Sequence, residues 1–167
     1  MPKHSTKKKQ HLSYSPYRPY QRKVVADEAD SRPLVVHLTK TVYQEIISHC
    51  QKELPFEACG LLSGSKGLVK GVWKMRNLHR SPYSFSMDLD ETEKVFTKME
   101  RQQQQFMGIY HSHPTGIAYP SREDILYNNC HDVVHFIVSL ASKKAVVKAF
   151  KFEGFKVIPY QIRVTGD

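Results

Sequence analysis

The sequence predicts a single α/β domain of the α+β type, in which helices are interspersed among strands around one core. Its 167 residues fit one domain, or one domain with a tail. Hydrophobic residues make up 40% of the chain, and no apolar run approaches the ~20 residues that a membrane span needs. Residues 33–167 contain both apolar runs typical of strands and amphipathic segments typical of helices, and we expect these residues to form the domain.

Residues 1–32 have the composition of a basic, disordered N-terminal arm. Leu12 is their only leucine and they contain no isoleucine, so they bury too little apolar surface to offset the entropy of ordering. Eight basic and three acidic residues give the arm +5 of the chain's formal net charge of +9. The charge that would suggest nucleic-acid binding therefore lies mostly outside the domain. The arm is either a solubilising leader or a contact for an acidic surface or nucleic acid.

The first half of the domain is predicted to begin with a strand over 34–38. Thr39 is a suitable N-cap for a helix over 39–53. An apolar stripe marks the buried face of that helix: Val42, Ile46, Ile47 and Cys50. The glycine-punctuated region 59–78 predicts a hairpin that turns at 64–67.

The second half is predicted to contain two more helices and four strands. Asp90 is placed to cap a helix over 91–104. A short strand over 107–111 precedes a loop rich in proline and glycine, and the last helix begins after Ser121. The β-branched run at 133–140 predicts a strand. Two more strands complete the domain, over 145–152 and 155–164, with a turn at Glu153-Gly154.

His111 and His113 form the first part of a candidate metal site. Residues two apart in a strand face the same way, about 6–7 Å apart, so both imidazoles can converge on one ion. Pro114 ends the strand, because it cannot donate to a sheet ladder, and a loop leads to Ser121 at the start of the helix. Asp124, in the first helical turn, can supply an anionic third ligand. Two histidines and one aspartate, with water in the fourth position, are typical of a catalytic zinc site.

Each part of this pattern also has a structural explanation. Nine histidines in one chain produce occasional His-x-His pairs by chance, and the Ser121-x-x-Asp124 pair is also a capping box. The histidine pair, the serine and the aspartate together at these offsets are expected by chance in about one sequence in a thousand. The joint pattern therefore favours a metal site, with Ser121 both capping the helix and serving the site.

Other residues that could carry chemistry have structural explanations too. His131 and His135 match the spacing of a helical zinc motif, but their segment resembles a strand, which would hold the rings roughly 13 Å apart. Cys59 could be a thiol nucleophile, although a cysteine beside an apolar strand is more often buried. Trp73 and Tyr119 could line a substrate groove or pack in the core and at its rim.

The pattern His111-x-His113, seven residues, Ser121-x-x-Asp124 resembles the signature of the JAMM (MPN-plus, JAB domain) zinc metalloproteases. That family also uses an upstream glutamate, and Glu57, at the start of Glu-Ala-Cys-Gly-Leu-Leu-Ser-Gly, matches its position. The resemblance covers about residues 34–164 and is greatest to small stand-alone bacterial and archaeal members. It implies an MPN-like fold: a mixed, mainly antiparallel curved sheet flanked by helices, with cytidine-deaminase-like layering.

The resemblance implies a zinc-dependent metallopeptidase or isopeptidase that holds one Zn²⁺ per chain through His111, His113, Asp124 and a water. Glu57 would be the general base that assists attack by the zinc-bound water, and Ser121 would donate a hydrogen bond to the oxyanion. The bond cleaved would be an amide after the Gly-Gly tail of a ubiquitin-like or sulfur-carrier protein, which would be the partner.

Two other functions are compatible with the sequence. RadC-type proteins, linked by name to DNA repair, share a similar stretch over 111–125, and the basic arm could bind nucleic acid; they usually also carry an upstream helical module that we do not expect here. A non-catalytic MPN interaction module is the other, although such domains typically lack part of the ligand set.

Three cysteines without paired spacing (Cys50, Cys59 and Cys130) favour a reducing compartment, so we expect a cytoplasmic protein with no membrane contact.

Overall fold

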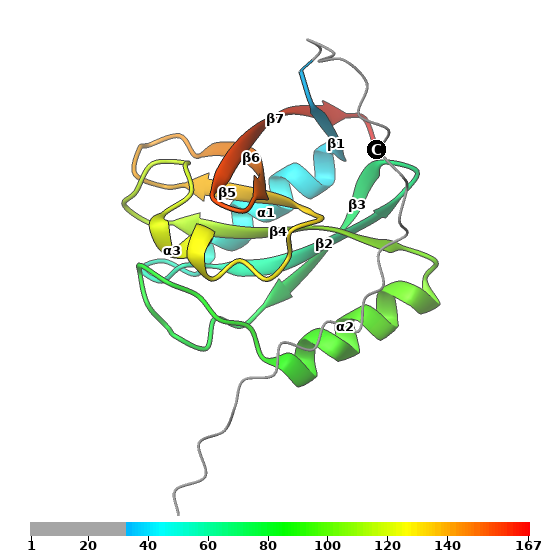
Figure 1. The fold of residues 1–167 in the computed structure, drawn as a ribbon, viewed down its shortest axis with the longest axis horizontal. Helices are drawn as coiled ribbons and strands as arrows, with labels where there is room; N and C mark the ends of the chain where they lie inside the picture. The colour runs from blue at the N-terminus through cyan, green and yellow to red at the C-terminus, as the bar shows by residue number, and fades with distance from the viewer. Residues whose placement is uncertain (1–32) are drawn as a thin grey trace, which may run out of the picture.

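The computed structural model describes residues 33–167, so the predicted arm over 1–32 lies outside the described residues. The described part forms ten elements in chain order: β1 (Val35–Thr39), α1 (Lys40–Lys52), β2 (Cys59–Ser65), β3 (Leu68–Met75), α2 (Leu89–Arg101), β4 (Gln105–His113), α3 (Arg122–Leu126), β5 (Val134–Ser139), β6 (Val146–Glu153) and β7 (Lys156–Thr165). Figure 1 shows how strands and helices share one body. Within this part, no helix is both long and apolar enough to span a membrane.

The strands form one closed barrel in the order β1-β3-β2-β4-β5-β6-β7. Antiparallel pairs join β2 to β3, β2 to β4, β5 to β6, and β6 to β7. Parallel pairs join β1 to β3, β1 to β7, and β4 to β5. The mixed, mainly antiparallel curved sheet implied by the JAMM resemblance is therefore present, and it closes because β1 pairs with both β3 and β7.

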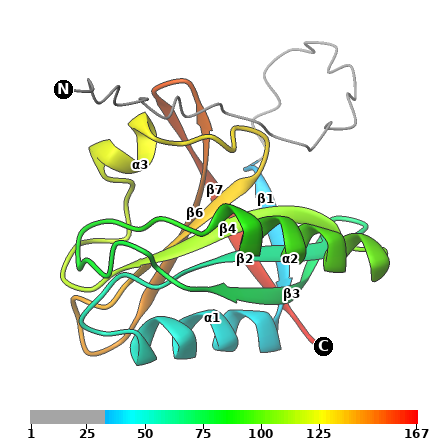
Figure 2. The same ribbon diagram turned by 90° about the horizontal axis from the view of Figure 1, so that it is seen from below.

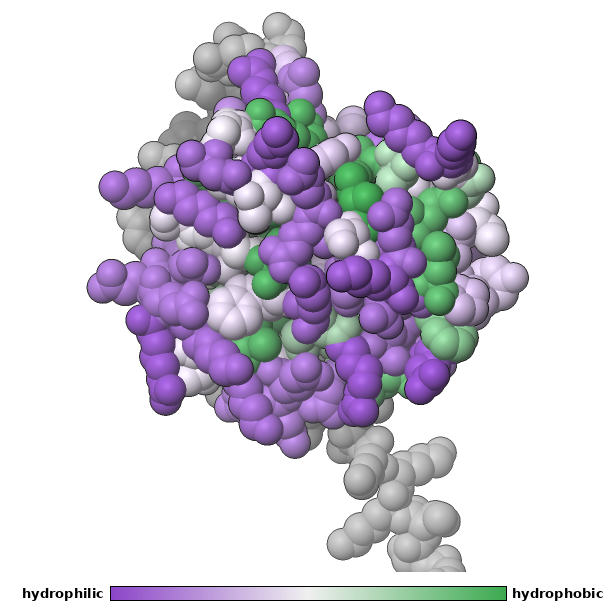
Figure 3. Space-filling view, turned by 180° about the vertical axis from the view of Figure 1, so that it is seen from behind, coloured by the Kyte–Doolittle hydropathy of each residue, from purple (hydrophilic) through white to green (hydrophobic). Residues whose placement is uncertain are grey.

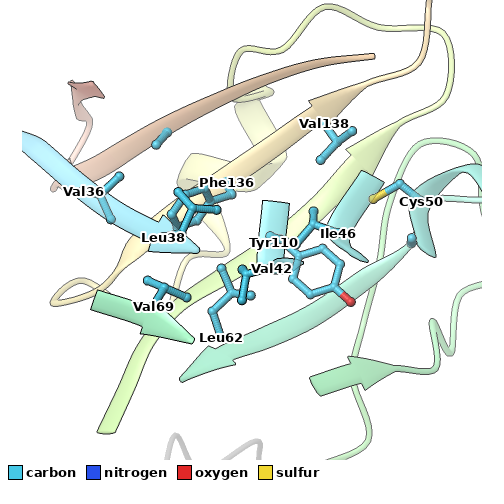
Figure 4. Close-up of a cluster of buried hydrophobic side chains, with 12 residues drawn as sticks. Val36, Leu38, Val42, Ile46, Cys50, Leu62, Val69, Tyr110, Phe136 and Val138 are labelled. Atoms are coloured by element: carbon cyan, nitrogen blue, oxygen red, sulfur yellow. The ribbon is translucent and has the colours of Figure 1, made fainter. Parts of the chain in front are cut away.

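Helix α1 packs against one face of this sheet. Thr39 is its N-cap, as predicted, and accepts a hydrogen bond from the Val42 amide at 3.3 Å. Val42, Ile46 and Cys50 are buried, whereas Ile47 is half-buried at the edge of the same cluster. Figure 4 shows this cluster, in which the α1 side chains meet residues of the surrounding strands. Burial of each large aliphatic side chain contributes about 1.5–3 kcal/mol, so this stripe fixes α1 on the sheet.

Helix α2 covers the opposite face of β2. Its buried residues Val95 and Met99 pack on Cys59, Leu61 and Met75. The intervening residues of β2 point into the α1 cluster, because side chains alternate along a strand. In Figures 1 and 2, β2 accordingly lies between the two helices.

The prediction of Asp90 as the cap of the second helix is wrong. The N-cap is Asp88, whose Oδ1 accepts a hydrogen bond from the Glu91 amide at 2.9 Å. Asp90 lies in the first turn, where its charge favourably meets the positive end of the helix dipole. The helix also ends at Arg101, before Gln103, which has a left-handed φ of 55°.

Two strand boundaries also differ from the sequence prediction. β4 extends over Gln105–His113 instead of 107–111, because it pairs along its length with β2 and β5. The last hairpin turns at Gly154 and Phe155, one residue later than expected, and Gly154 takes the positive φ of 60°. The longer β4 matters for function, because it places both histidines of the predicted metal site within one strand.

Candidate metal centre

The alternation of side chains along β4 places the two histidines on the face of the sheet opposite α1. Tyr110 is fully buried in the α1 cluster, so its neighbours His111 and Ile109 point the other way. His111 pairs in register with Ile137 of β5, which packs against Ile125 of α3. α3 therefore lies over the face that carries the histidines, and in Figure 2 it is on the side of the sheet opposite α1.

A capping box at the start of α3 fixes the predicted third ligand. Ser121 Oγ accepts a hydrogen bond from the Asp124 amide at 3.1 Å, and the Ser121 amide donates to Asp124 Oδ2 at 2.7 Å. The carboxylate of Asp124 is thereby held at the helix start. The capping box is therefore present, and it is compatible with the predicted ligand role because the cap also orients the carboxylate.

The donor atoms of His111, His113 and Asp124 converge. The two histidine Nε2 atoms are 3.1 Å apart, and Asp124 places Oδ1 3.3 Å from His111 Nε2 and Oδ2 3.4 Å from His113 Nε2. Nitrogen and oxygen ligands that bind zinc at about 2.0–2.1 Å with tetrahedral angles lie about 3.3 Å from one another. The observed separations are close to this value, with each histidine facing a different oxygen of Asp124, so the donor set fits a zinc ion between the three side chains.

Both histidine rings are oriented by neighbours that the sequence did not indicate. His113 Nδ1 lies 2.8 Å from the carbonyl of Ile117, and a proton on this nitrogen leaves Nε2 free to bind a metal. Phe85 stacks on His111, with ring centroids 4.7 Å apart and planes inclined by 27°. The other ring nitrogen of His111, Nδ1, is buried and has no hydrogen-bond partner among residues 33–167. Phe85 meets His111 through a tertiary contact, which leaves no local pattern in the chain, whereas the Ile117 carbonyl lies only four residues after His113, in the loop that follows it.

The electrostatics of the three side chains favour a cation. Burial would raise the pKa of Asp124, but its hydrogen bonds with His111 and His113 hold that pKa far below its usual range. Burial would lower the pKa of His113, yet Asp124 and the Ile117 carbonyl hold it above its ordinary value. The carboxylate thus attracts positive charge to the space between the two rings. Either protons on the histidines or a metal ion can supply this charge.

Glu57 lies in the segment between α1 and β2 and its side chain is only 4% exposed. Burial raises the pKa of this carboxyl to about 7; His113 opposes the rise, while Asp124 and Glu123 add to it. These electrostatic interactions indicate that Glu57 lies near the metal-site residues. A buried carboxyl that exchanges its proton near neutral pH is suited to general-base chemistry.

The alternative candidates lie outside this cluster. His135 lies 3.0 Å from the Cys130 carbonyl and packs on Phe152, and His131 is not part of the group of potential metal ligands found in the described residues. Cys59 is fully buried, and burial, with Glu57 adding to it, raises the pKa of its thiol to about 12, so the thiolate nucleophile is disfavoured.

The two aromatic residues considered for a substrate groove differ. Trp73 packs in the cluster beneath α2, and its Nε1 donates to Ser63 Oγ at 2.7 Å. Tyr119 is 49% exposed, and its ring meets Phe150 edge-on at 5.4 Å. Trp73 is therefore a packing residue, whereas Tyr119 lies at the surface in the loop between His113 and α3, where it could contact a substrate.

A groove of about 360 Å³ lies elsewhere, between α1 and the last two strands. It is lined by Tyr43 of α1 and by eight residues of β6 and β7: Val147, Lys148, Ala149, Phe150, Pro159, Tyr160, Ile162 and Val164. The reverse side of the molecule, drawn in Figure 3, is mostly hydrophilic with scattered apolar areas. None of the residues predicted for the metal centre lines this groove.

Comparison with known protein families gives one match, over residues 39–153, to the prokaryotic homologs of the JAB domain. Three curated relatives are similar to parts of the chain. A CysO-cysteine peptidase of Mycobacterium tuberculosis is 35% identical over 96 residues, which are 56% of this chain and 66% of the relative. A probable TtuB-protein conjugate cleaving protease of Thermus thermophilus is 34% identical over 93 residues, 55% and 62% of the two chains. A desampylase of Pyrococcus furiosus is 36% identical over 69 residues, 41% and 49%. The chain thus matches about half to two thirds of the length of these relatives.

Two solved structures show the same fold. A protein from Desulfitobacterium hafniense, solved in solution, has a TM-score of 0.74 and 33% identity over 80% of this chain and 94% of its own. A JAB1/MPN domain protein from Archaeoglobus fulgidus has a TM-score of 0.51 and 19% identity over 77% of this chain and 96% of its own. At 19% identity, the similarity to the Archaeoglobus fulgidus protein shows only that the two chains share a fold.

Proposed function

The chain belongs to the prokaryotic homologs of the JAB domain, and on that premise we propose that it is a zinc-dependent metallopeptidase or isopeptidase of the JAMM type. It hydrolyses an amide bond after the Gly-Gly tail of a ubiquitin-like or sulfur-carrier protein. The observation that carries this proposal is the convergence of donor atoms from three side chains, with separations of 3.1–3.4 Å between them, while the buried carboxyl of Glu57 interacts electrostatically with His113 and Asp124.

In this proposal His111, His113 and Asp124 hold one zinc ion per chain and leave a fourth position open to solvent and substrate. A zinc ion held there supplies a Lewis acid for the scissile carbonyl and a water of lowered pKa. The chain supplies the rest. The capping box holds Asp124, and the Ile117 carbonyl holds the His113 ring in the tautomer that exposes Nε2.

Glu57 acts as the general base. Its carboxylate takes a proton from the attacking water and passes it to the leaving amine, a cycle that a carboxyl with a pKa of about 7 can complete in both directions near neutral pH. Burial is the main cause of that raised pKa, so the same desolvation that tunes the group also excludes competing water.

Ser121 stabilises the developing oxyanion. Its Oγ accepts a hydrogen bond from the Asp124 amide, and its hydroxyl hydrogen takes no part in that bond. The hydroxyl can therefore donate to an oxygen of the substrate at the mouth of the site. A donor of this kind contributes about 2.7–4 kcal/mol to transition-state stabilisation in other hydrolases.

The relatives support the class of substrate. They are named for the cleavage of CysO-cysteine, for the cleavage of TtuB-protein conjugates and for desampylation. We propose that the present chain likewise cleaves a conjugate of a small carrier protein, with the extended tail of the carrier lying across the metal centre.

Metal analysis and mass spectrometry test this function together. Wild-type protein expressed with zinc should contain about one zinc per chain, and it should release the amine from a carrier whose Gly-Gly tail is joined to cysteine or to a lysine side chain. Glu57→Gln should keep the zinc and lose at least about 100-fold in rate. His131→Ala is the matched control, since this histidine lies outside the site. Equal turnover by wild type and Glu57→Gln, or a wild-type protein without zinc, would contradict the proposal.

A further inference from the structure

Every polar main-chain atom of Glu57 and of Ala58 has a hydrogen-bond partner. The Glu57 amide donates to the Ser81 carbonyl at 2.9 Å, and the Glu57 carbonyl accepts from Asn77 Nδ2 at 3.0 Å. On the next residue, the Ala58 amide donates to Ser112 Oγ at 2.8 Å, and the Ala58 carbonyl accepts from the Ser112 amide at 3.0 Å. The base is thus held from β4 on one side and from the loop after β3 on the other.

Asn77 organises the loop after β3, which holds the main chain of Glu57 on the side away from β4. Its side chain makes four hydrogen bonds to main-chain atoms, although it is only 7% exposed. Nδ2 donates to the carbonyls of Glu57 and Ser84, both at 3.0 Å. Oδ1 accepts from the amides of His79 at 3.0 Å and Ser86 at 3.2 Å. Two carbonyls face one end of the amide and two N–H groups face the other, so only an asparagine in this orientation satisfies all four groups.

The same loop also reaches the metal centre. Ser86 and Ser84, both bonded to Asn77, flank Phe85, whose ring stacks on His111 at 4.7 Å. A single side chain outside the motif residues therefore connects the main chain of Glu57 with the residue that packs against a metal-binding ring. Displacement of Asn77 would move both parts of the site relative to each other.

We propose that Asn77 is a positioning residue for catalysis: its amide sets the place of Glu57 relative to the metal centre and fixes the loop that carries Phe85. This inference rests on the proposed function, because Glu57 is the base in that function. Asn77 does not touch the ligand atoms. Its effect falls on the rate of the chemical step, since a displacement of about 1 Å in a reacting group costs on the order of 100-fold.

Asn77→Asp is the sharpest test. Aspartate has nearly the same shape and keeps the acceptor for the His79 and Ser86 amides, but an ionised carboxylate cannot donate to the carbonyls of Glu57 and Ser84. Asn77→Ser, neutral and too short to bridge the loop, is a second variant in case the aspartate does not fold. Ser63→Ala is the matched control. Ser63 is a fully buried hydrogen-bonded residue of the same strand that follows Glu57, and it bonds Trp73 and Gln104 away from the site.

Three measurements are compared on zinc-loaded protein: kcat and KM for the carrier conjugate, zinc content, and amide hydrogen exchange at Glu57 and Ser86. We expect Asn77→Asp to lower kcat by about 10–100-fold, with KM changed by less than about threefold and one zinc per chain retained. Exchange at both amides should become faster. Ser63→Ala should leave kcat within about twofold of wild type even if it melts at a lower temperature.

Two outcomes overturn the inference while leaving the proposed function intact: wild-type kcat in both Asn77 variants, or an equal loss of kcat in Ser63→Ala. If wild-type protein cleaves no conjugate, the proposed function fails. Hydrogen exchange then decides the role of Asn77: unchanged exchange at Glu57 overturns it, and faster exchange supports its hold on this segment.

Discussion

His135 and His113 are both buried histidines, yet their neighbours give them opposite tendencies to accept a proton. His113 faces Asp124, which raises its pKa against the effect of burial. His135 has the Cys130 carbonyl and the Phe152 ring as neighbours, and burial lowers its pKa to about 4. His113, which faces a carboxylate, suits the binding of a cation, whereas His135, buried with a carbonyl and an aromatic ring as neighbours, stays neutral and supports the core.

Acid should destabilise the protein partly through His135. A pKa of about 4 in the folded state, against 6.5 in the unfolded chain, means that its contribution is complete above pH 6.5 and is lost as the pH falls through 4. The full difference corresponds to roughly 3 kcal/mol. Urea denaturation of metal-free wild type and His135→Gln at pH 7 and pH 4 measures it. The variant should lose less free energy of unfolding between the two pH values, and parallel losses would contradict the assignment.

Removal of the anionic ligand should abolish tight metal binding. Asp124→Asn keeps the size of the side chain but withdraws the charge that faces both histidine rings, so zinc affinity should fall by more than about 100-fold. Competition with a coloured chelator measures the affinity. Asp132→Asn removes an acidic group that is outside the ligand cluster, and it should leave the affinity unchanged within about threefold. Equal affinities for both variants would exclude Asp124 as a ligand.

The sequence was informative wherever a single element brings proposed site residues together. The strand period unites His111 with His113, and the capping box sets Asp124 beside Ser121. Asn77 could not be found in this way. It reaches Glu57 across the open end of the β2–β3 hairpin, 20 residues away in the chain, and no motif marks it.

At the scale of elements, side-chain patterns predicted which elements form, and tertiary pairing set their limits. β4 is longer than its apolar run because β2 and β5 both supply hydrogen bonds beyond it. The start of α2 was misplaced because Asp88 and Asp90 are both good caps, and only the backbone conformation at Asp88 decides between them. Sheet closure through β1 likewise depends on partners at opposite ends of the domain.

Two adjacent isoleucines of α1 give a test of how the helix is held. Ile46 is 1% exposed in the core, while Ile47 is half-buried at its edge. Ile46→Ala should lower the free energy of unfolding by about 2–5 kcal/mol, because it leaves a cavity that the sheet cannot fill. Ile47→Ala should cost clearly less. Chemical denaturation measures both, and zinc content should stay at wild-type level, since α1 lies on the face opposite the ligands. Equal costs would mean that the stripe is oriented differently.

At the scale of the whole molecule, much of the excess positive charge and the proposed metal site lie in different parts of the chain. Residues 1–32 carry +5 and the remaining residues +4, while every residue proposed for the site lies between Glu57 and Asp124. Deletion of 1–32 should therefore leave zinc content and conjugate cleavage within about twofold of wild type, and it should weaken any salt-sensitive association with polyanions. Metal analysis, turnover and DNA binding at two salt concentrations check this. Loss of zinc on deletion would mean that the domain begins before residue 33.

Closure of the barrel has a consequence for how the protein is made. Val35 of β1 pairs with Gln161 of β7, 126 positions later, so the first strand of the barrel gains one of its two neighbours only when the last has been synthesised. At a ribosomal rate of about 5–20 residues per second, β1 waits on the order of ten seconds for that partner. The strand and the helix that carry the proposed metal ligands, β4 and α3, are synthesised during this interval. The nascent chain can therefore bring its proposed zinc ligands together before its sheet is complete, and the barrel closes only once β7 is available to pair with β1.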